Sequence, residues 1–246
     1  MKKCFISMLT ILLLVSALLA GCSSNITSYK NSSELKEETS VDYTSAVDHS
    51  EFVPIVDKDN TRYFSWHTDR FRSFQSLDEL SANAPLIISG ECIEATTVYK
   101  LNNIYTLSQV KVKDVYKGNV SSGDIIWVVE CGGRTYFGDY DKNCMVDEKE
   151  FENKEDRLPA DFQIVIGLDG YYPLKCGEEV LLFLGDTSGF LPDFNNPLYD
   201  VIGDTDGKLY VQENGSYKKA SPSSTDEYIF DDNNLTITVE ELKTIV

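Results

Sequence analysis

The residues that could do chemistry in this chain are few, and their spacing gives little support to an enzyme. The stretch Ser65-Trp66-His67-Thr68-Asp69 holds a serine, a histidine and an acid, the residue types of a nucleophilic triad. Such triads are assembled across a fold, and the strained Gly-x-Ser-x-Gly turn that presents a nucleophilic serine is missing. Phosphate-loop, dinucleotide and zinc-protease motifs are missing too. We therefore expect a non-catalytic protein without a cofactor, with a hydrolase as the most distant alternative.

Carboxylates suggest a calcium site only weakly. Asp204-Thr205-Asp206-Gly207 is similar to the start of a calcium-binding loop, but such a loop needs a glycine at position six and a glutamate at position twelve. Those positions hold Leu209 and Gly215, so we expect a hairpin turn at Asp206-Gly207. A looser calcium site around Asp139 and Asp141 is an alternative, but we expect no bound metal.

The segment 1–21 has the three parts of a secretory signal peptide: two lysines, an apolar core and small residues at the end. Its last residues and the next one, Leu19-Ala20-Gly21-Cys22, resemble the cleavage site of bacterial lipoproteins. The resemblance implies cleavage before Cys22 and a diacylglyceryl group on its sulfur. The apolar core is too short for a membrane-spanning helix, which needs about 20 residues. We therefore expect a protein held by lipid on the outer face of the cell membrane.

Four further cysteines would then lie in an oxidising compartment, where three pairings are available. A disulfide between Cys131 and Cys144 would fix a charged loop and stabilise the domain by about 3 kcal/mol on the chain-entropy estimate. Elimination pairs Cys92 with Cys176, and free thiols at these two positions are the alternative. Neither Cys-x-x-Cys spacing nor a nearby histidine supports a zinc site.

Residues 22–51 have the composition of a disordered tether. From residue 23 on, 13 of 29 residues are Ser, Thr or Asn, and six acids face two lysines, which is too little apolar surface to offset the entropy of ordering. Loss of residues 1–21 removes two lysines and no acid and takes the formal net charge from −18 to −20. Such acidity disfavours nucleic acid and favours cations or basic partners.

The remaining residues, 52–246, read as one extracytoplasmic β domain. The capping box Ser76-Leu77-Asp78-Glu79 predicts a short helix over 77–83, and Thr238-Val239-Glu240-Glu241 predicts a closing helix. Val115 falls one residue out of step with Val110 and Val112, which suggests a β-bulge. The charged stretch 132–160 is expected to be a long loop. Runs rich in Ile, Val and Tyr predict strands over 86–99, 104–116, 124–131, 162–168 and 179–184.

A succession of short motifs between residues 77 and 206 resembles a group of secreted and lipid-anchored proteins of Gram-positive bacteria with no assigned activity. Their strand pattern is in turn similar to the OB-like barrel of netrin-like and metalloprotease-inhibitor domains. The resemblance implies a mainly β fold, an OB-like Greek-key barrel of five to six strands, with a β-sandwich as the alternative. The motifs are Ser89-Gly90, Tyr105-Thr106-Leu107, Val110-Lys111-Val112, Val115-Tyr116-Lys117-Gly118, Gly123-Asp124-Ile125, Pro173-Leu174-Lys175, Gly177-Glu178-Glu179 and Leu182-Phe183-Leu184.

Two kinds of function fit these observations. Inhibitor domains of the similar barrel chelate a protease metal with a free N-terminal cysteine, and the expected lipid on Cys22 argues against that use. We favour a non-catalytic, surface-anchored interaction module with a protein partner. The alternative is a domain that binds a carbohydrate or another small molecule with aromatic residues, which would otherwise close the end of a barrel. These residues are Tyr171, Tyr172, Phe190, Phe194 and Tyr199.

Overall fold

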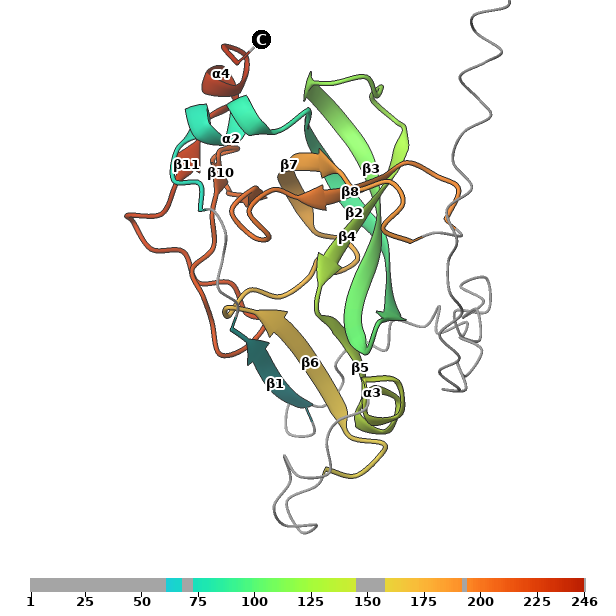
Figure 1. Cartoon of the computed structure of the whole chain (residues 1–246). Coiled ribbons are helices and arrows are strands. Elements are labelled where there is room, and N and C mark those ends of the chain that lie inside the picture. Colours follow the sequence, from blue (N-terminus) through green and yellow to red (C-terminus); the bar gives the residue numbers. More distant parts are fainter. Residues whose placement is uncertain (1–60, 68–72, 145–157, 192–193, 246) are drawn as a thin grey trace, which may run out of the picture. The chain divides into compact units, whose positions relative to one another are not determined.

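The computed structural model describes residues 61–67, 73–144, 158–191 and 194–245, which belong to a single unit of the chain. This part of the chain is mainly β, as predicted (Figure 1). None of its helices is long and apolar enough to cross a membrane. The helices are α2 (Leu77–Asn83), α3 (Phe137–Cys144) and α4 (Val239–Leu242); the strands are β1 (Thr61–Trp66), β2 (Leu86–Lys100), β3 (Asn103–Lys117), β4 (Ile125–Cys131), β5 (Gly133–Tyr136), β6 (Gln163–Leu168), β7 (Glu179–Asp186), β8 (Leu198–Val201), β9 (Lys208–Val211), β10 (Tyr217–Lys218) and β11 (Thr236–Ile237).

A long hairpin of β2 and β3 forms the centre of the larger sheet. The two strands join through Leu101 and Asn102, which both adopt the left-handed conformation. Their register shifts at three places, and two of these shifts lie opposite the stretch from Val112 to Lys117. The bulge predicted from the spacing of Val110, Val112 and Val115 is thus confirmed. Each extra residue increases the local twist and lets the hairpin curl.

The larger sheet is mixed and has eight strands among the described residues, in the order β11-β10-β9-β7-β2-β3-β4-β8. The predicted barrel of five to six strands therefore does not form a sheet of its own, because its strands belong to this larger sheet. β4 and β8 run parallel. The end of β7 also pairs with β8 from Leu184 to Asp186. The pairings β2-β3-β4-β8-β7-β2 consequently form a closed cycle within the sheet.

A smaller sheet has the order β1-β6-β5, with β1 parallel and β5 antiparallel to β6. Helix α3 follows β5 directly, so the prediction of one long loop over residues 132–160 is wrong for 133–144; residues 145–157 lie outside the described part. Phe137 and Cys144 are the buried residues of α3 and pack with Ile104, Ile164 and Ile166. Two apolar residues seven positions apart anchor the helix.

The C-terminal part extends the larger sheet beyond β7. β9 pairs with β7 on one side and with β10 on the other, so the hairpin is β9–β10. The chain does turn at Asp206-Gly207, but this turn connects β8 to β9, which are not neighbours in the sheet, so the hairpin expected there is wrong. β11 and α4 complete this end, and Thr238 and Glu241 form the predicted capping box. Helix α2 also begins as predicted, because Ser76 accepts a hydrogen bond from the Glu79 backbone N–H.

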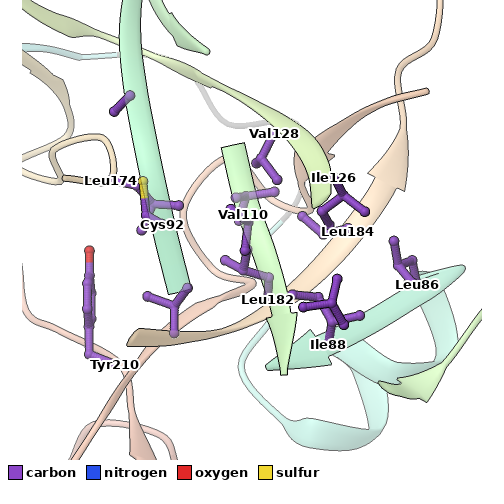
Figure 2. Packing of buried hydrophobic residues seen from close by; sticks show 14 of the residues in the cluster. Leu86, Ile88, Cys92, Val110, Ile126, Val128, Leu174, Leu182, Leu184 and Tyr210 are labelled. Carbon is purple, nitrogen blue, oxygen red and sulfur yellow. The ribbon is translucent and has the colours of Figure 1, made fainter. Parts of the chain in front are cut away.

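The largest apolar core lies between the strands of the cyclic pairing, where side chains from β2, β3, β4 and β7 converge (Figure 2). Ile88, Val110, Val128 and Leu182 are fully buried there. Leu174 enters this core from the loop after β6, and Tyr210 reaches it from β9. The loop 169–178 and β9 are therefore held by the same packing as the central hairpin.

Candidate functional site

A small hollow lies where the end of β4, the loop after β6, the β7–β8 connection and the turn before β9 meet. Its volume is about 110 Å³, below the 300–1,000 Å³ or so of most small-molecule sites. Elements far apart in the sequence contribute to it, so its geometry depends on the whole fold. The lining residues are Tyr105, Val129, Glu130, Cys131, Leu168, Tyr171, Tyr172, Pro173, Thr187, Phe190, Asp200, Val201, Asp204, Thr205 and Lys208.

A buried ion pair between Glu130 and Lys208 forms the base of the hollow. Their side chains are 5% and 3% exposed, and the Lys208 ammonium donates to Glu130 Oε1. The ammonium also donates to the Tyr172 carbonyl oxygen at 2.9 Å, while Glu130 Oε2 accepts from the Leu174 backbone N–H at 3.0 Å. Both charges are thus hydrogen-bonded, as buried charges must be. The pair ties β4 and β9 to the loop after β6.

Two carboxylates, Asp200 and Asp204, lie at the rim and have no ion-pair partner among the described residues. Desolvation raises the pKa of Asp200, and the negative charges of Asp204 and Asp186 raise it further. Asp204 adopts a left-handed backbone with φ of 60°, a conformation that Asp and Asn tolerate better than most residues. The rim therefore carries negative charge that no cation of the described residues pairs with.

Thr205 also lines the hollow, but its hydroxyl oxygen has less than 1 Å² of accessible surface. Thr205 is 5% exposed, and its Oγ1 has no hydrogen-bond partner within the described part of the chain. A buried polar atom without a partner costs free energy and in native structures calls for a physical reason. The turn that carries it is tight, with Asp206 N–H and Thr205 N–H both donating to the Gly203 carbonyl.

Aromatic rings form much of the remaining wall. Tyr105 and Phe190 meet edge to face with centroids 5.0 Å apart, and Lys100 Nζ lies 3.8 Å from the Phe190 centroid. On the other side, Lys219 Nζ lies 5.6 Å from the Tyr171 centroid. Two of the rings thus already attract ammonium groups, as the negative face of an aromatic ring does.

The structure brings three of the five predicted ligand-binding aromatics to the hollow. Tyr171 and Phe190 line it and are partly exposed, while Tyr172 lines it but is only 4% exposed. Phe194 packs edge to face on Trp127 with centroids 5.2 Å apart. Tyr199 packs against the main core. The five rings therefore do not form one exposed patch.

A second cluster of buried charge surrounds Asp226. Arg134 Nη2 donates to its Oδ2 at 2.9 Å, the Tyr63 hydroxyl donates to its Oδ1 at 3.0 Å, and Lys175 Nζ donates to its backbone carbonyl at 3.0 Å. Burial acts to raise the pKa of Asp226. The hydrogen bond and charge of Arg134 and the charge of Lys175 outweigh that effect, and the pKa is lowered. Burial, with the hydrogen bond to Asp226, raises the pKa of Tyr63 to about 12.

A third buried carboxylate, Asp206, accepts from the Lys219 ammonium and from the Phe74 backbone N–H, the latter at 2.8 Å. Its side chain is 1% exposed. Asp206 thus joins the turn between β8 and β9 to the segment before α2 and to Lys219, which follows β10. Neither this carboxylate nor Asp226 lines the hollow.

The four described cysteines are free thiols, so the predicted disulfides Cys131–Cys144 and Cys92–Cys176 are not formed. Cys131 ends β4 at the hollow, whereas Cys144 packs with Phe137 in a different cluster. Cys92 is fully buried in the main core and its Sγ contacts the Glu94 carbonyl, while the exposed Cys176 donates to the Ile93 carbonyl. Desolvation by burial raises the pKa of Cys92 to about 12 and those of Cys131 and Cys144 to about 11.

The other residues singled out by sequence lie outside the hollow. His67 Nδ1 is 3.2 Å from Asp169 Oδ1 with the imidazole 87% exposed, and the Ser65 hydroxyl accepts from Gly170 N–H. Asp139 and Asp141 lie in α3. Within the described ranges no group of three or more His, Cys, Asp or Glu is placed to hold a metal ion. Cys22 and Asp69 lie outside the described residues.

Sequence reasoning missed Glu130, Lys208 and Asp200, and it considered Thr205 only as part of a possible calcium loop. Glu130 carried a signal, because it interrupts the apolar run of β4 as the only acid in Ile125–Cys131. A charge inside a buried strand implies a buried partner. Lys208 begins a strand of otherwise ordinary composition, and nothing local marks it as that partner.

Comparison with known proteins finds no protein family that matches the chain and no curated protein that is similar to it.

Proposed function

We propose that this protein is a non-catalytic interaction module of the cell surface, anchored in the membrane by a lipid on Cys22. The resemblance of Leu19-Ala20-Gly21-Cys22 to a lipoprotein cleavage site supports the anchor. Two acyl chains hold a protein stably where one binds only marginally. Residues 22–51 would separate the domain from the bilayer, with a root-mean-square span of about 30 Å for a flexible chain of this length.

We further propose that the cycle β2-β3-β4-β8-β7 is an OB-like barrel, and that the chain belongs with the lipid-anchored proteins of Gram-positive bacteria that it resembles. The pairing order supports this, because five strands are linked in a closed cycle with one parallel pair, β4–β8. The OB-fold is a five-stranded, partly open Greek-key barrel. β9, β10 and β11 would then be an extension on the outer edge of β7.

One observation carries the interaction function: Asp200 and Asp204 are exposed at the rim of an aromatic hollow and have no ion-pair partner among the described residues, while the buried acids Glu130, Asp206 and Asp226 have cationic partners. Unpaired surface carboxylates in a chain of net charge −18 attract positively charged surfaces and repel nucleic acid. The partner that fits is a basic protein at the cell surface.

A small-molecule ligand is the second candidate, favoured by the partly exposed rings of Tyr171 and Phe190 in one hollow. Aromatic rings stack on the flat faces of sugars and similar ligands. The volume of about 110 Å³ limits this ligand to a few non-hydrogen atoms inside the hollow, since one water occupies about 30 Å³ in the liquid. We therefore rank this function second.

Crosslinking on live cells tests the interaction function. The full lipid-anchored chain is displayed, crosslinked and recovered, with a chain ending at residue 51 as the control for the tether and lipid. We expect the full chain, and not the control, to capture a recurrent basic protein whose yield falls as salt rises, because exposed charges are screened. Recovery of the same envelope proteins by both chains would refute the proposal.

A further inference from the structure

We infer that Asn214, in the turn between β9 and β10, is a site of spontaneous chemical modification. Its side-chain amide is lost as ammonia when the backbone nitrogen of the next residue attacks the amide carbon. Asn214-Gly215 is the only Asn-Gly pair in the chain, and both residues are exposed. The inference is independent of the proposed function, because this turn does not line the hollow.

The turn holds the two residues in a defined geometry. The Gln212 N–H donates to the Ser216 carbonyl at 2.7 Å, and the Gly215 N–H donates to the Gln212 carbonyl at 2.8 Å. Gly215 has φ of 79°, as the left-handed residue at the end of a three-residue hairpin loop does. There is open space where its Cβ would lie. Glycine therefore suits the turn and leaves its backbone nitrogen unshielded by a side chain.

Two donors of Ser216 polarise the side-chain carbonyl of Asn214. Its Oδ1 accepts from the Ser216 backbone N–H at 3.0 Å and from the Ser216 hydroxyl at 2.7 Å. A backbone N–H can only donate, so the atom that faces it is the oxygen and not the amide nitrogen. Donors aimed at an oxygen that gains negative charge stabilise the transition state of attack on its carbon. Ser216 is only 7% exposed, so these donors are held in place.

The reaction is the hydrolysis of an amide through a cyclic intermediate. Local opening of the exposed turn frees the Gly215 N–H from the Gln212 carbonyl. The Gly215 nitrogen then loses its proton to water and bonds to Cγ of Asn214, an attack favoured because both groups belong to adjacent residues. The amide C–N bond breaks, and its nitrogen takes a proton from water and leaves as ammonia. Water opens the resulting succinimide at either carbonyl, which leaves aspartate or isoaspartate at position 214 without any change in oxidation state.

The products change the hairpin in two ways. Both add a negative charge to a chain whose formal net charge is already −18. Isoaspartate also adds a backbone atom inside the loop that the hydrogen bond between Gln212 and Ser216 closes. β9 carries Lys208, the cation of the buried pair with Glu130. We therefore expect the isoaspartate form to unfold at a lower urea concentration than the unmodified chain.

Peptide mass mapping of the full chain, stored at neutral pH, tests the inference. Replacement of the amide NH₂ by OH changes the peptide mass, and electron-transfer fragmentation distinguishes isoaspartate from aspartate. Asn119 is the internal control, because it is also exposed and lies between two strands, but the β-branched Val120 follows it. We expect Asn214 to convert about tenfold faster than Asn119, because a branched side chain hinders the approach of the backbone nitrogen, and to give both aspartate and isoaspartate.

Two variants test the roles of the neighbouring residues. Ser216→Ala removes the hydroxyl donor but keeps the backbone N–H, and we expect conversion to slow about fivefold, the effect of one ordinary hydrogen bond. Gly215→Asn places a Cβ beside the attacking nitrogen in a left-handed position that Asn tolerates, and we expect about tenfold slower conversion at Asn214. If Ser216→Ala fails to fold, Gly215→Asn and the comparison with Asn119 decide. Equal rates at Asn214 and Asn119, aspartate without isoaspartate, or an unchanged rate in a folded variant would overturn the inference.

Discussion

Replacing Lys208 by methionine should destabilise this domain more than any loss of an exposed lysine. Methionine keeps the length of the aliphatic side chain but removes the ammonium, and it leaves the Glu130 carboxylate buried at 5% exposure without its cation. Breaking a buried pair from one side costs about 3–5 kcal/mol, because the remaining charge is uncompensated. That loss is a large fraction of the roughly 5–15 kcal/mol that holds a typical domain folded.

A double variant makes this prediction sharper. Glu130→Gln/Lys208→Met leaves no charge at the base of the hollow, and the glutamine oxygen can still accept from the Leu174 backbone N–H. The Tyr172 carbonyl, which accepts from Lys208 at 2.9 Å, loses that partner, at a cost of about 1–3 kcal/mol. The double variant should therefore be more stable than Lys208→Met alone.

Urea unfolding followed by tryptophan fluorescence measures these differences, since Trp127 lies in β4, the strand that holds Glu130. Lys113→Met is the control, because the Lys113–Glu179 pair spans 2.6 Å but its side chains are 41% and 47% exposed. We expect it to cost less than about 1 kcal/mol. A loss below about 1 kcal/mol for Lys208→Met, or a double variant less stable than the single one, would refute the reasoning.

Three further predictions concern other parts of the domain. Because the pKa of Asp226 is lowered in the folded state, the unfolded state binds this proton more readily. The carboxylate therefore stabilises the fold above its ordinary pKa of 3.8, and that stabilisation is lost as pH falls through the folded-state pKa. In urea unfolding from pH 2 to 6 the unfolding free energy of Asp226→Asn should depend less on pH than that of the unmodified protein, and an equal pH dependence would contradict this. Gly132 has φ of 99°, and a Cβ there would overlap the Ile166 carbonyl oxygen, whereas Gly123 has φ of 93° and open space around its Cβ position. Gly132→Ala should therefore lower the unfolding free energy by about 2 kcal/mol more than Gly123→Ala. Equal losses in the two variants would be inconsistent with that overlap. In the native state an alkylating reagent should modify Cys176 first, because it alone among the four described cysteines is exposed. Peptide mass mapping identifies the modified residue. Two cysteines among Cys92, Cys131 and Cys144 that react only after reduction would indicate a disulfide where we expect free thiols.

Local signals in the sequence predict the regular elements well. The capping residues Ser76 and Thr238 set the starts of two short helices, because a hydroxyl acceptor at that position satisfies free N–H groups wherever the chain goes next. The odd spacing of Val115 predicts a bulge for an equally local reason. Helix α3 escaped prediction because only Phe137 and Cys144 of its eight residues are buried, which is too weak a pattern to separate from a polar loop.

The site depends on contacts that no local pattern encodes. Asp200 and Tyr171 meet at the hollow because β8 runs parallel to β4 while the loop after β6 folds across the same end. The disulfide predictions failed for a related reason. The prediction paired Cys131 with Cys144 because they are close in sequence. In the structure β5 and α3 separate them, and their side chains lie in different clusters.

The ion pair at the base of the hollow joins residues 78 positions apart, and this separation bears on how the chain acquires its structure during synthesis. Glu130 is synthesised long before Lys208, so burying β4 leaves the Glu130 carboxylate without its cation until β9 has been synthesised. β7 is in the same position, because its outer edge is shared between β8 and β9. A chain stopped before residue 208 therefore carries an uncompensated carboxylate and an open strand edge, the features that proteases and aggregation exploit. Only a chain that extends through β9 can neutralise Glu130 with Lys208 and cover the outer edge of β7.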